Sequence, residues 1–167
     1  TSEQVNSPVS STKATASFGF IEAYSRYVAP LSREERSQAF AEGAAAARLY
    51  GALGAPTTLD DWEEQLAQTT PHLERSDIMF EFLEIMRTAP VGPRFARPVQ
   101  RLLVRASVDL VPPALRRKLG LEEFGLLPGQ RTAVSLMAKA ANRIPLKNAP
   151  PAQACLRMGL KADFLYG

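Results

Sequence analysis

The stretch Tyr24-Ser-Arg-Tyr-Val-Ala-Pro-Leu-Ser-Arg-Glu-Glu-Arg36 decides how the amino-terminal half of the chain folds. The ring of Pro30 and its missing N–H cannot continue a helix, so the first helix is predicted to end near Val28. Ser32 and Glu35 stand three residues apart, as the two partners of a capping box do, and begin a second helix. The stretch therefore predicts two helices joined by a short turn.

The same helical pattern continues along the chain, whereas the alternation typical of strands is almost absent. Apolar residues recur at spacings of three and four between recognisable caps and breakers. We expect an all-α fold with six to seven helices in a single domain, which is part of a larger helical assembly. The helical domain is predicted over residues 13–145, between a flexible tail at 1–12 and an irregular tail at 146–167.

Three of the expected helices carry informative apolar surfaces. The second helix, expected to end at Gly54, has almost no side-chain bulk at residues 43–47, which suits either close helix packing or a flat ligand. The helix that opens at Ser76 and Asp77 is apolar over most of its surface and is predicted to be the most buried element. The last long helix, over residues 130–144, is predicted to face inward through the following residues: Ala133, Leu136, Met137, Ala140, Ala141 and Ile144.

The chain holds one histidine, His72, and one cysteine, Cys155. An internal disulfide is therefore impossible, and the usual cysteine and histidine site for zinc cannot be assembled. His72 lies in a turn-like Thr-Thr-Pro-His run and is expected at the surface. Cys155 is expected to be a buried, inert thiol, because no second histidine exists to activate it. The sequence assigns no catalytic residue and no metal site.

Charge is distributed unevenly. Residues 1–85 hold 6 Lys and Arg against 13 Asp and Glu, while residues 86–167 hold 14 against 4. Arg97, Arg101 and Arg105 follow one another at steps of four and are predicted to form an outward basic ridge on one helix. The ridge is either a solvated face or a contact for an anionic membrane, an acidic partner or a cofactor carboxylate. Nucleic acid is not expected, because no aromatic residues alternate with these arginines.

Three segments of the sequence also carry a family resemblance. The turn at residues 24–36, the helix end Leu-Gly-Ala-Pro56 and the run Val111-Pro-Pro-Ala-Leu-Arg-Arg-Lys-Leu-Gly-Leu121 together resemble the haem-dependent oxygenases named for MpaB and the latex-clearing proteins, which are rubber oxygenases. The resemblance covers roughly residues 13–145 and corresponds to the carboxyl-terminal portion of the family's domain. It implies haem b as cofactor and O₂-dependent oxidation of a hydrophobic substrate.

The resemblance also shows a departure. Family members often read Trp-Val-His-Ala-Thr before the Pro-Leu-Ser turn, and here the matching residues are Ser11-Thr-Lys-Ala-Thr15, so that Lys13 replaces the histidine. A neutral lysine can bind haem iron if burial lowers its pKa, but a lysine on a first turn is more often exposed. By this resemblance Lys13, Thr15 and Tyr24 are the candidates for residues near the cofactor.

The preferred interpretation is a carboxyl-terminal part or subunit of a haem-dependent oxygenase, whose iron ligands come from an upstream segment or a partner chain. Whether the chain acts as an enzyme would depend on that missing piece. The alternative is a non-catalytic helical interaction subunit that has lost the cofactor. No segment is predicted to span a membrane, so the chain is expected in the cytoplasm or at a membrane surface.

Overall fold

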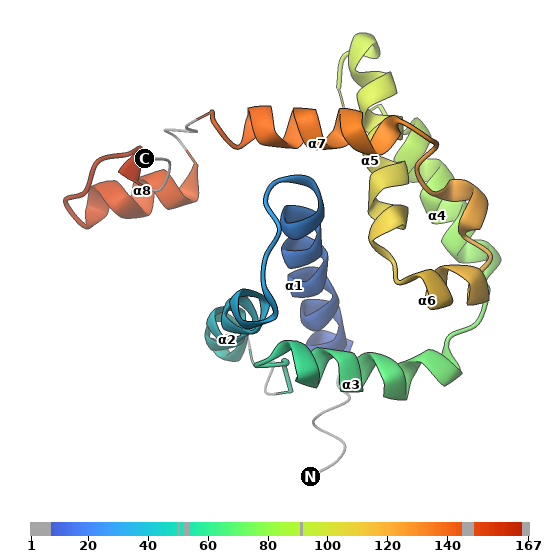
Figure 1. Cartoon of the computed structure of the whole chain (residues 1–167), viewed down its shortest axis with the longest axis horizontal. Helices are drawn as coiled ribbons and strands as arrows, with labels where there is room; N and C mark the ends of the chain where they lie inside the picture. The colour runs from blue at the N-terminus through green and yellow to red at the C-terminus, as the bar shows by residue number, and fades with distance from the viewer. Residues whose placement is uncertain (1–7, 50, 52–53, 91, 145–148, 165–167) are drawn as a thin grey trace.

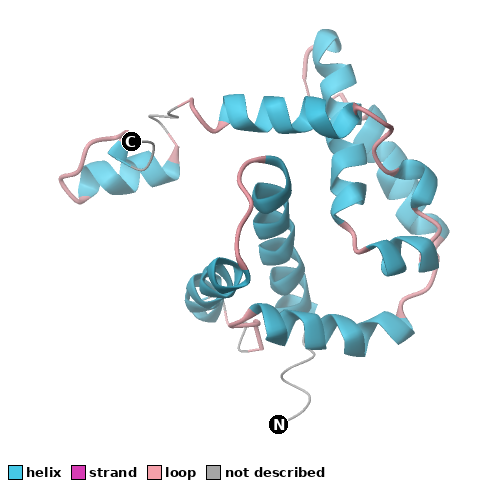
Figure 2. Ribbon diagram, in the orientation of Figure 1, coloured by secondary structure: helices cyan, strands magenta, loops and turns pink. Residues whose placement is uncertain are grey.

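In the computed structural model the chain is all-α, and the structure describes residues 8–49, 51, 54–90, 92–144 and 149–164. No strand occurs among these residues, which confirms the predicted fold class (Figure 2). The described residues form eight α-helices: α1 (Pro8–Tyr27), α2 (Arg33–Leu49), α3 (Leu59–Thr69), α4 (Asp77–Thr88), α5 (Arg97–Leu110), α6 (Pro113–Lys118), α7 (Gln130–Ala141) and α8 (Pro150–Arg157). Short 3₁₀ helices lie at Thr70–His72, Arg94–Ala96 and Glu122–Phe124.

The turn between α1 and α2 has the predicted construction. The Glu35 amide donates to Ser32 Oγ over 3.1 Å, and the Ser32 amide donates to Glu35 Oε2 over 2.7 Å. A second capping box joins Thr58 and Asp61 at the start of α3. Both boxes satisfy amides that a helix start leaves without intrahelical partners. These caps fix where α2 and α3 begin.

Several helix boundaries differ from the expectation, and one of them is the end of the last long helix, which lies at Ala141 rather than at Ile144. The second helix ends at Leu49 rather than at Gly54, because Gly51 adopts a φ of 78°, which favours glycine and terminates the helix. Residues 8–12, expected in a flexible tail, belong to α1, and residues 150–157, expected to be irregular, form α8. In both cases a proline stands at the start of the helix, where its missing N–H costs nothing. The tail expected at residues 1–7 lies outside the described residues.

The core consists of two separate clusters. Around α1, α2 and α3, buried Phe40, Leu59 and Trp62 pack against partly buried Phe18 and Ile21. The Phe18 and Trp62 rings stack with centroids 4.7 Å apart. Where α1 meets α5 and α7, a second cluster joins Tyr27, Ala106 and Val134. Helix α1 therefore contributes to both clusters and links the two halves of the chain (Figure 1).

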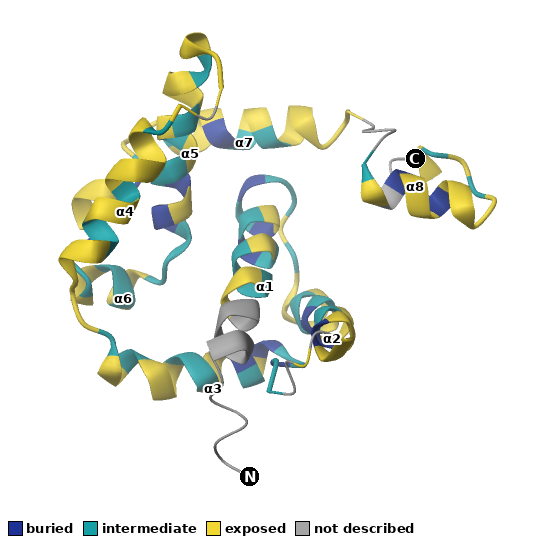
Figure 3. Cartoon of the chain, turned by 180° about the vertical axis from the view of Figure 1, so that it is seen from behind, coloured by how far each residue is buried: buried dark blue, intermediate teal, exposed yellow. Residues whose placement is uncertain are grey.

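Two helices are far more exposed than their sequences predict (Figure 3). None of the described residues of α4 is buried, and Ile78 and Phe82 are 77% and 57% exposed. On α7 the buried residue is Val134, while Leu136 of the predicted inward stripe is exposed, as is Ile144, which lies beyond the end of α7. The predictions for these two faces are wrong for one reason. Periodicity identifies an apolar face, but it does not say whether this chain supplies the element that covers it.

The structure also tests the predictions for His72, for Cys155 and for the small residues 43–47. His72 is exposed in its 3₁₀ helix, as expected, and Cys155 is buried. At residues 43–47 the small side chains serve helix packing: Ala44 and Ala47 are buried, and a Cβ on Gly43 would lie 3.5 Å from Ser17 Oγ of α1. Within the described part of the chain, no helix is long and apolar enough to cross a membrane.

Candidate functional site

A cavity of about 540 Å³ lies between α1, α3 and the α5–α6 corner. This volume falls within the range of roughly 300–1,000 Å³ that is usual for small-molecule pockets. None of the lining residues carries a charge. The walls are formed by Thr15, Phe18, Gly19, Trp62, Gln65, Leu66, Thr69, Leu73, Ser107, Leu110, Val111, Pro112 and Leu115.

The polar groups of the lining mostly bond to the protein itself. Thr69 donates its hydroxyl to the Gln65 carbonyl over 2.8 Å, and Ser107 donates to the Val104 carbonyl over 2.8 Å. The Gln65 amide donates to the Gly54 carbonyl over 3.2 Å. Since these donors already have acceptors, the cavity favours an apolar ligand over one that needs several hydrogen bonds.

Gly19 opens directly into this cavity. No heavy atom beyond its helix backbone and chain neighbours lies within 4 Å of the place where its Cβ would stand. Glycine in a helix interior costs roughly 0.5–1 kcal/mol relative to alanine, so local stability does not explain its presence. Its effect on the site is to leave space on the α1 wall opposite Leu66 and Trp62 of α3, which also line the cavity.

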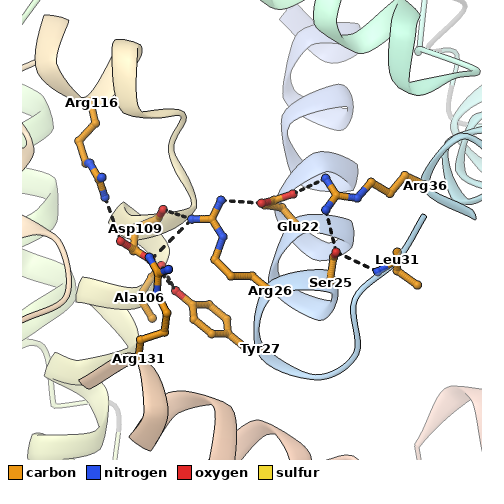
Figure 4. Close-up of polar contacts among 10 residues, drawn as sticks. All are labelled: Glu22, Ser25, Arg26, Tyr27, Leu31, Arg36, Ala106, Asp109, Arg116 and Arg131. Carbon is orange, nitrogen blue, oxygen red and sulfur yellow. Dashed lines mark hydrogen bonds and ion pairs between the residues drawn. The ribbon is translucent and has the colours of Figure 1, made fainter. Parts of the chain in front are cut away.

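Toward its carboxyl-terminal end, α1 continues beyond the cavity into a partly buried network of charges (Figure 4). Glu22 and Arg26 follow Thr15 and Gly19 at helical spacing, so that the same side of α1 lines the cavity and carries the network. Glu22 accepts from Arg26 over 2.6 Å and from Arg36 of α2 over 3.0 Å. Arg26 also donates to the backbone carbonyl of Asp109 on α5.

Asp109 is the centre of this network and is only 6% exposed. Its carboxylate accepts from Arg116 of α6 over 3.0 Å and from Arg131 of α7 over 2.8 Å, and Arg26 of α1 lies 3.6 Å away. The Tyr27 hydroxyl donates to the same carboxylate over 3.3 Å. One buried acid thus joins four helices, three of which also line the cavity.

The surroundings of Asp109 shift two pKa values. Burial is the largest influence on Asp109 and opposes ionisation, but hydrogen bonds from Arg116 and Arg131, with the charges of Arg131 and Arg26, outweigh it and hold the pKa of Asp109 below its usual value. Burial, followed by the negative charge of Asp109, raises the pKa of Tyr27 to about 12. The carboxylate is therefore ionised and the phenol neutral at neutral pH.

The structure separates the residues that the sequence placed near a cofactor. Thr15 lines the cavity, whereas Tyr24 lies on another side of α1, is 41% exposed and does not line it. The side chain of Lys13 lies outside what the structure describes. Asp109 and its arginines were not predicted as a group, because Arg26 and Asp109 are 83 residues apart in the sequence.

The basic ridge is only partly exposed. Arg97 and Arg101 are exposed, but Arg105 is half-buried, donates to the Glu123 carbonyl over 3.2 Å and has a buried Nε without a hydrogen-bond partner. Asp109, which continues the same series, turns into the protein. The exposed part of the ridge therefore lies at the amino-terminal end of α5.

Comparison with known families identifies the domain. The family model of the catalytic domain of the ER-bound oxygenases mpaB/B' and rubber oxygenase matches residues 10–143. The chain belongs to this oxygenase family. The match runs from the first turn of α1 to the end of α7, and therefore includes every residue of the cavity and of the Asp109 network. No curated protein and no solved structure matches the chain.

The described cavity does not supply the donor that a haem iron requires. Haem iron is held by histidine, cysteine, methionine or tyrosine side chains, and none of these residue types lines the cavity. Across the described residues, no group of three or more His, Cys, Asp and Glu side chains could hold a metal ion. The residues present thus fit an apolar ligand but do not by themselves fit iron.

Proposed function

We propose that this chain forms one wall of the substrate pocket in a haem-dependent oxygenase-like domain, and that the iron donors come from an upstream segment or a partner chain. The observation that carries the proposal is the uncharged cavity of about 540 Å³ inside the part of the chain that matches the oxygenase family. Haem, once held by those other donors, would supply the O₂ chemistry. The residues of this chain would bind the apolar substrate and exclude water.

The uncovered faces of α4 and α7 support a further segment in the complete protein. Contiguous apolar surface is seldom left in water by a soluble protein. Ile78, Phe82 and Ile85 form one such stripe on α4, and Leu136 and Met137 are exposed apolar side chains on α7. A segment that brings the iron donors would bury part of this surface when it docks.

Filling the cavity at Gly19 tests the pocket. We expect Gly19→Leu to reduce binding of a neutral apolar fluorophore, N-phenyl-1-naphthylamine, by at least about tenfold, because the new side chain would occupy ligand space. The free energy of unfolding should not fall, since replacing a helical glycine contributes up to about 1 kcal/mol. Fluorescence titration and urea denaturation measure the two effects.

Two further variants control this experiment. Gly19→Ala shares the helix gain but adds only a methyl group, and it should retain most of the fluorophore binding. Ile78→Ser with Phe82→Ser removes exposed apolar surface on α4 and should leave the cavity signal unchanged. Equal binding by wild type and Gly19→Leu would exclude this cavity as the binding site.

The absence of an iron donor among the cavity residues favours a second candidate, a helical interaction subunit that has lost the cofactor. The two candidates differ in the visible absorption of the chain purified with its natural neighbours. A Soret band is expected for the oxygenase pocket, and a fully loaded preparation without one would favour the interaction subunit.

A further inference from the structure

The α4–α5 hairpin projects from the rest of the molecule at the turn between its helices (Figures 1 and 3). We call residues 92–101, which form the described end of this hairpin and the first turn of α5, the hairpin tip. Gln100 holds the two helices together, because its amide donates to the carbonyls of Met86 and Ala89 over 2.7 and 2.8 Å. These hydrogen bonds hold the tip in a fixed position relative to the end of α4.

The hairpin tip combines an exposed aromatic ring with unpaired positive charge. Phe95 is 84% exposed, although burying a side chain of this size is usually worth roughly 1.5–3 kcal/mol. Arg94, Arg97 and Arg101 are exposed, and none has an acidic partner among the described residues. Residues 92–101 contain three arginines and no Asp or Glu. The local field is therefore strongly positive.

The positions on α5 indicate how such a tip would approach a surface. Arg97 and Arg101 lie on one side of the helix, and Val99 and Leu103 lie on another, because residues four apart share a side and residues two apart do not. A helix lying flat could present only one of the two sides. An approach with the tip first brings Phe95, Arg94 and Arg97 to the surface together.

A lipid bilayer with anionic headgroups fits this chemistry better than an acidic protein. The headgroup boundary accepts an aromatic ring and, at the same depth, pairs guanidinium groups with phosphate. It also accepts a projecting tip without a matching pocket, which a protein partner would need for Phe95. The prolines at positions 93 and 98 restrict the backbone on either side of the ring, which lowers the entropy lost on docking.

We propose that the hairpin tip is a peripheral membrane-docking element, in which Phe95 enters the headgroup boundary of an anionic phospholipid bilayer while Arg94, Arg97 and Arg101 bind lipid phosphates. The proposal does not depend on haem or on oxygenase activity. The partner of the hairpin tip is the bilayer surface.

Vesicle sedimentation tests the proposal. Wild type should bind vesicles of phosphatidylserine and phosphatidylcholine, and binding should weaken as salt rises. The variant Arg94→Gln/Arg97→Gln/Arg101→Gln should lose affinity by about fivefold per arginine, on the order of 100-fold together. The control Arg48→Gln/Arg143→Gln/Arg157→Gln removes the same charge from exposed positions elsewhere and should lose far less.

A second measurement reports on insertion of the ring. Phe95→Trp should show a blue shift of its emission with anionic vesicles, against the constant background of Trp62, which is buried. Phe95→Ser should weaken vesicle binding by on the order of tenfold at unchanged net charge.

Three outcomes would overturn the proposal. The first is equal loss of binding in the two triple variants, and the second is no emission shift in Phe95→Trp. The third is retention on immobilised polyglutamate without binding to anionic vesicles, which would assign the hairpin tip to an acidic protein partner.

Discussion

Replacing Asp109 by Asn is expected to lower the free energy of unfolding by about 3–5 kcal/mol. The change keeps the shape of the side chain but removes the one negative charge that Arg26, Arg116 and Arg131 share. Forming a buried ion pair adds little net stability, because both partners lose their water. Removing one partner is costly, since the other charges remain in place without compensation. Domain stabilities are roughly 5–15 kcal/mol, so the variant should be close to unfolding.

Urea denaturation followed by the helical circular dichroism signal measures this effect. Asp60→Asn is a suitable control because Asp60 pairs with Arg33 at the surface, where an ion pair contributes up to about 1 kcal/mol. Arg131→Gln should fall between the two, since Arg131 is 61% exposed and can be hydrated when unpaired. A loss below about 1 kcal/mol in Asp109→Asn would show that the network is not a central structural element.

Stability should depend on pH differently in wild type and in Asp109→Asn. The pKa of Asp109 is lowered in the folded chain, so the folded state holds its proton more weakly than the unfolded state does. The stabilisation from Asp109 is therefore present above the unfolded pKa of about 3.9 and is lost as the pH falls through the folded pKa. Below about pH 4, wild type should lose more stability than Asp109→Asn. If the free energy of unfolding fell equally with pH in both proteins, Asp109 would not be the source of the pH dependence.

The position of Asp109 among four helices explains its expected effect on stability. Its partners lie on α1, α6 and α7, and α1, α5 and α6 also form walls of the cavity. We therefore expect the network to hold those walls in place as well as to stabilise the fold. Weakening it should alter ligand binding even though Asp109 does not line the cavity.

Local signals in the sequence were enough to predict the all-α fold and several helix starts. The capping boxes of α2 and α3 depend on residues three apart, so the sequence contains all the information they need. Gly51 was missed as the end of α2 because Gly54 and Pro56 make a similar local pattern.

The candidate site could not be predicted in the same way. Asp109 is visible in the sequence as the acid that continues the series Arg97, Arg101 and Arg105, but its partners lie 7, 22 and 83 residues away. The apolar faces of α4 and α7 were recognised, while their exposure depends on which elements the chain contains. Thr15 was named as a candidate through the family resemblance, and the structure adds the uncharged cavity around it.

Under the proposed function, we expect haem to bind only when the proposed upstream segment or partner chain is present. The isolated chain should bind hemin weakly and without a defined ratio, because no residue of a usual donor type lines the described cavity. His72 is exposed and is the one histidine of the chain, so His72→Ala provides the control for adventitious binding at the surface. With the upstream segment or partner chain present, a stable one-to-one complex should form.

Titration of hemin into the chain, with and without that segment or partner, is the most direct test of this account. The Soret band and gel filtration together report ligation, ratio and oligomeric state. We expect a sharp Soret band with a one-to-one endpoint in the assembled protein and none in the isolated chain or in its His72→Ala variant. Tight one-to-one binding of hemin by the isolated, monomeric chain would contradict it.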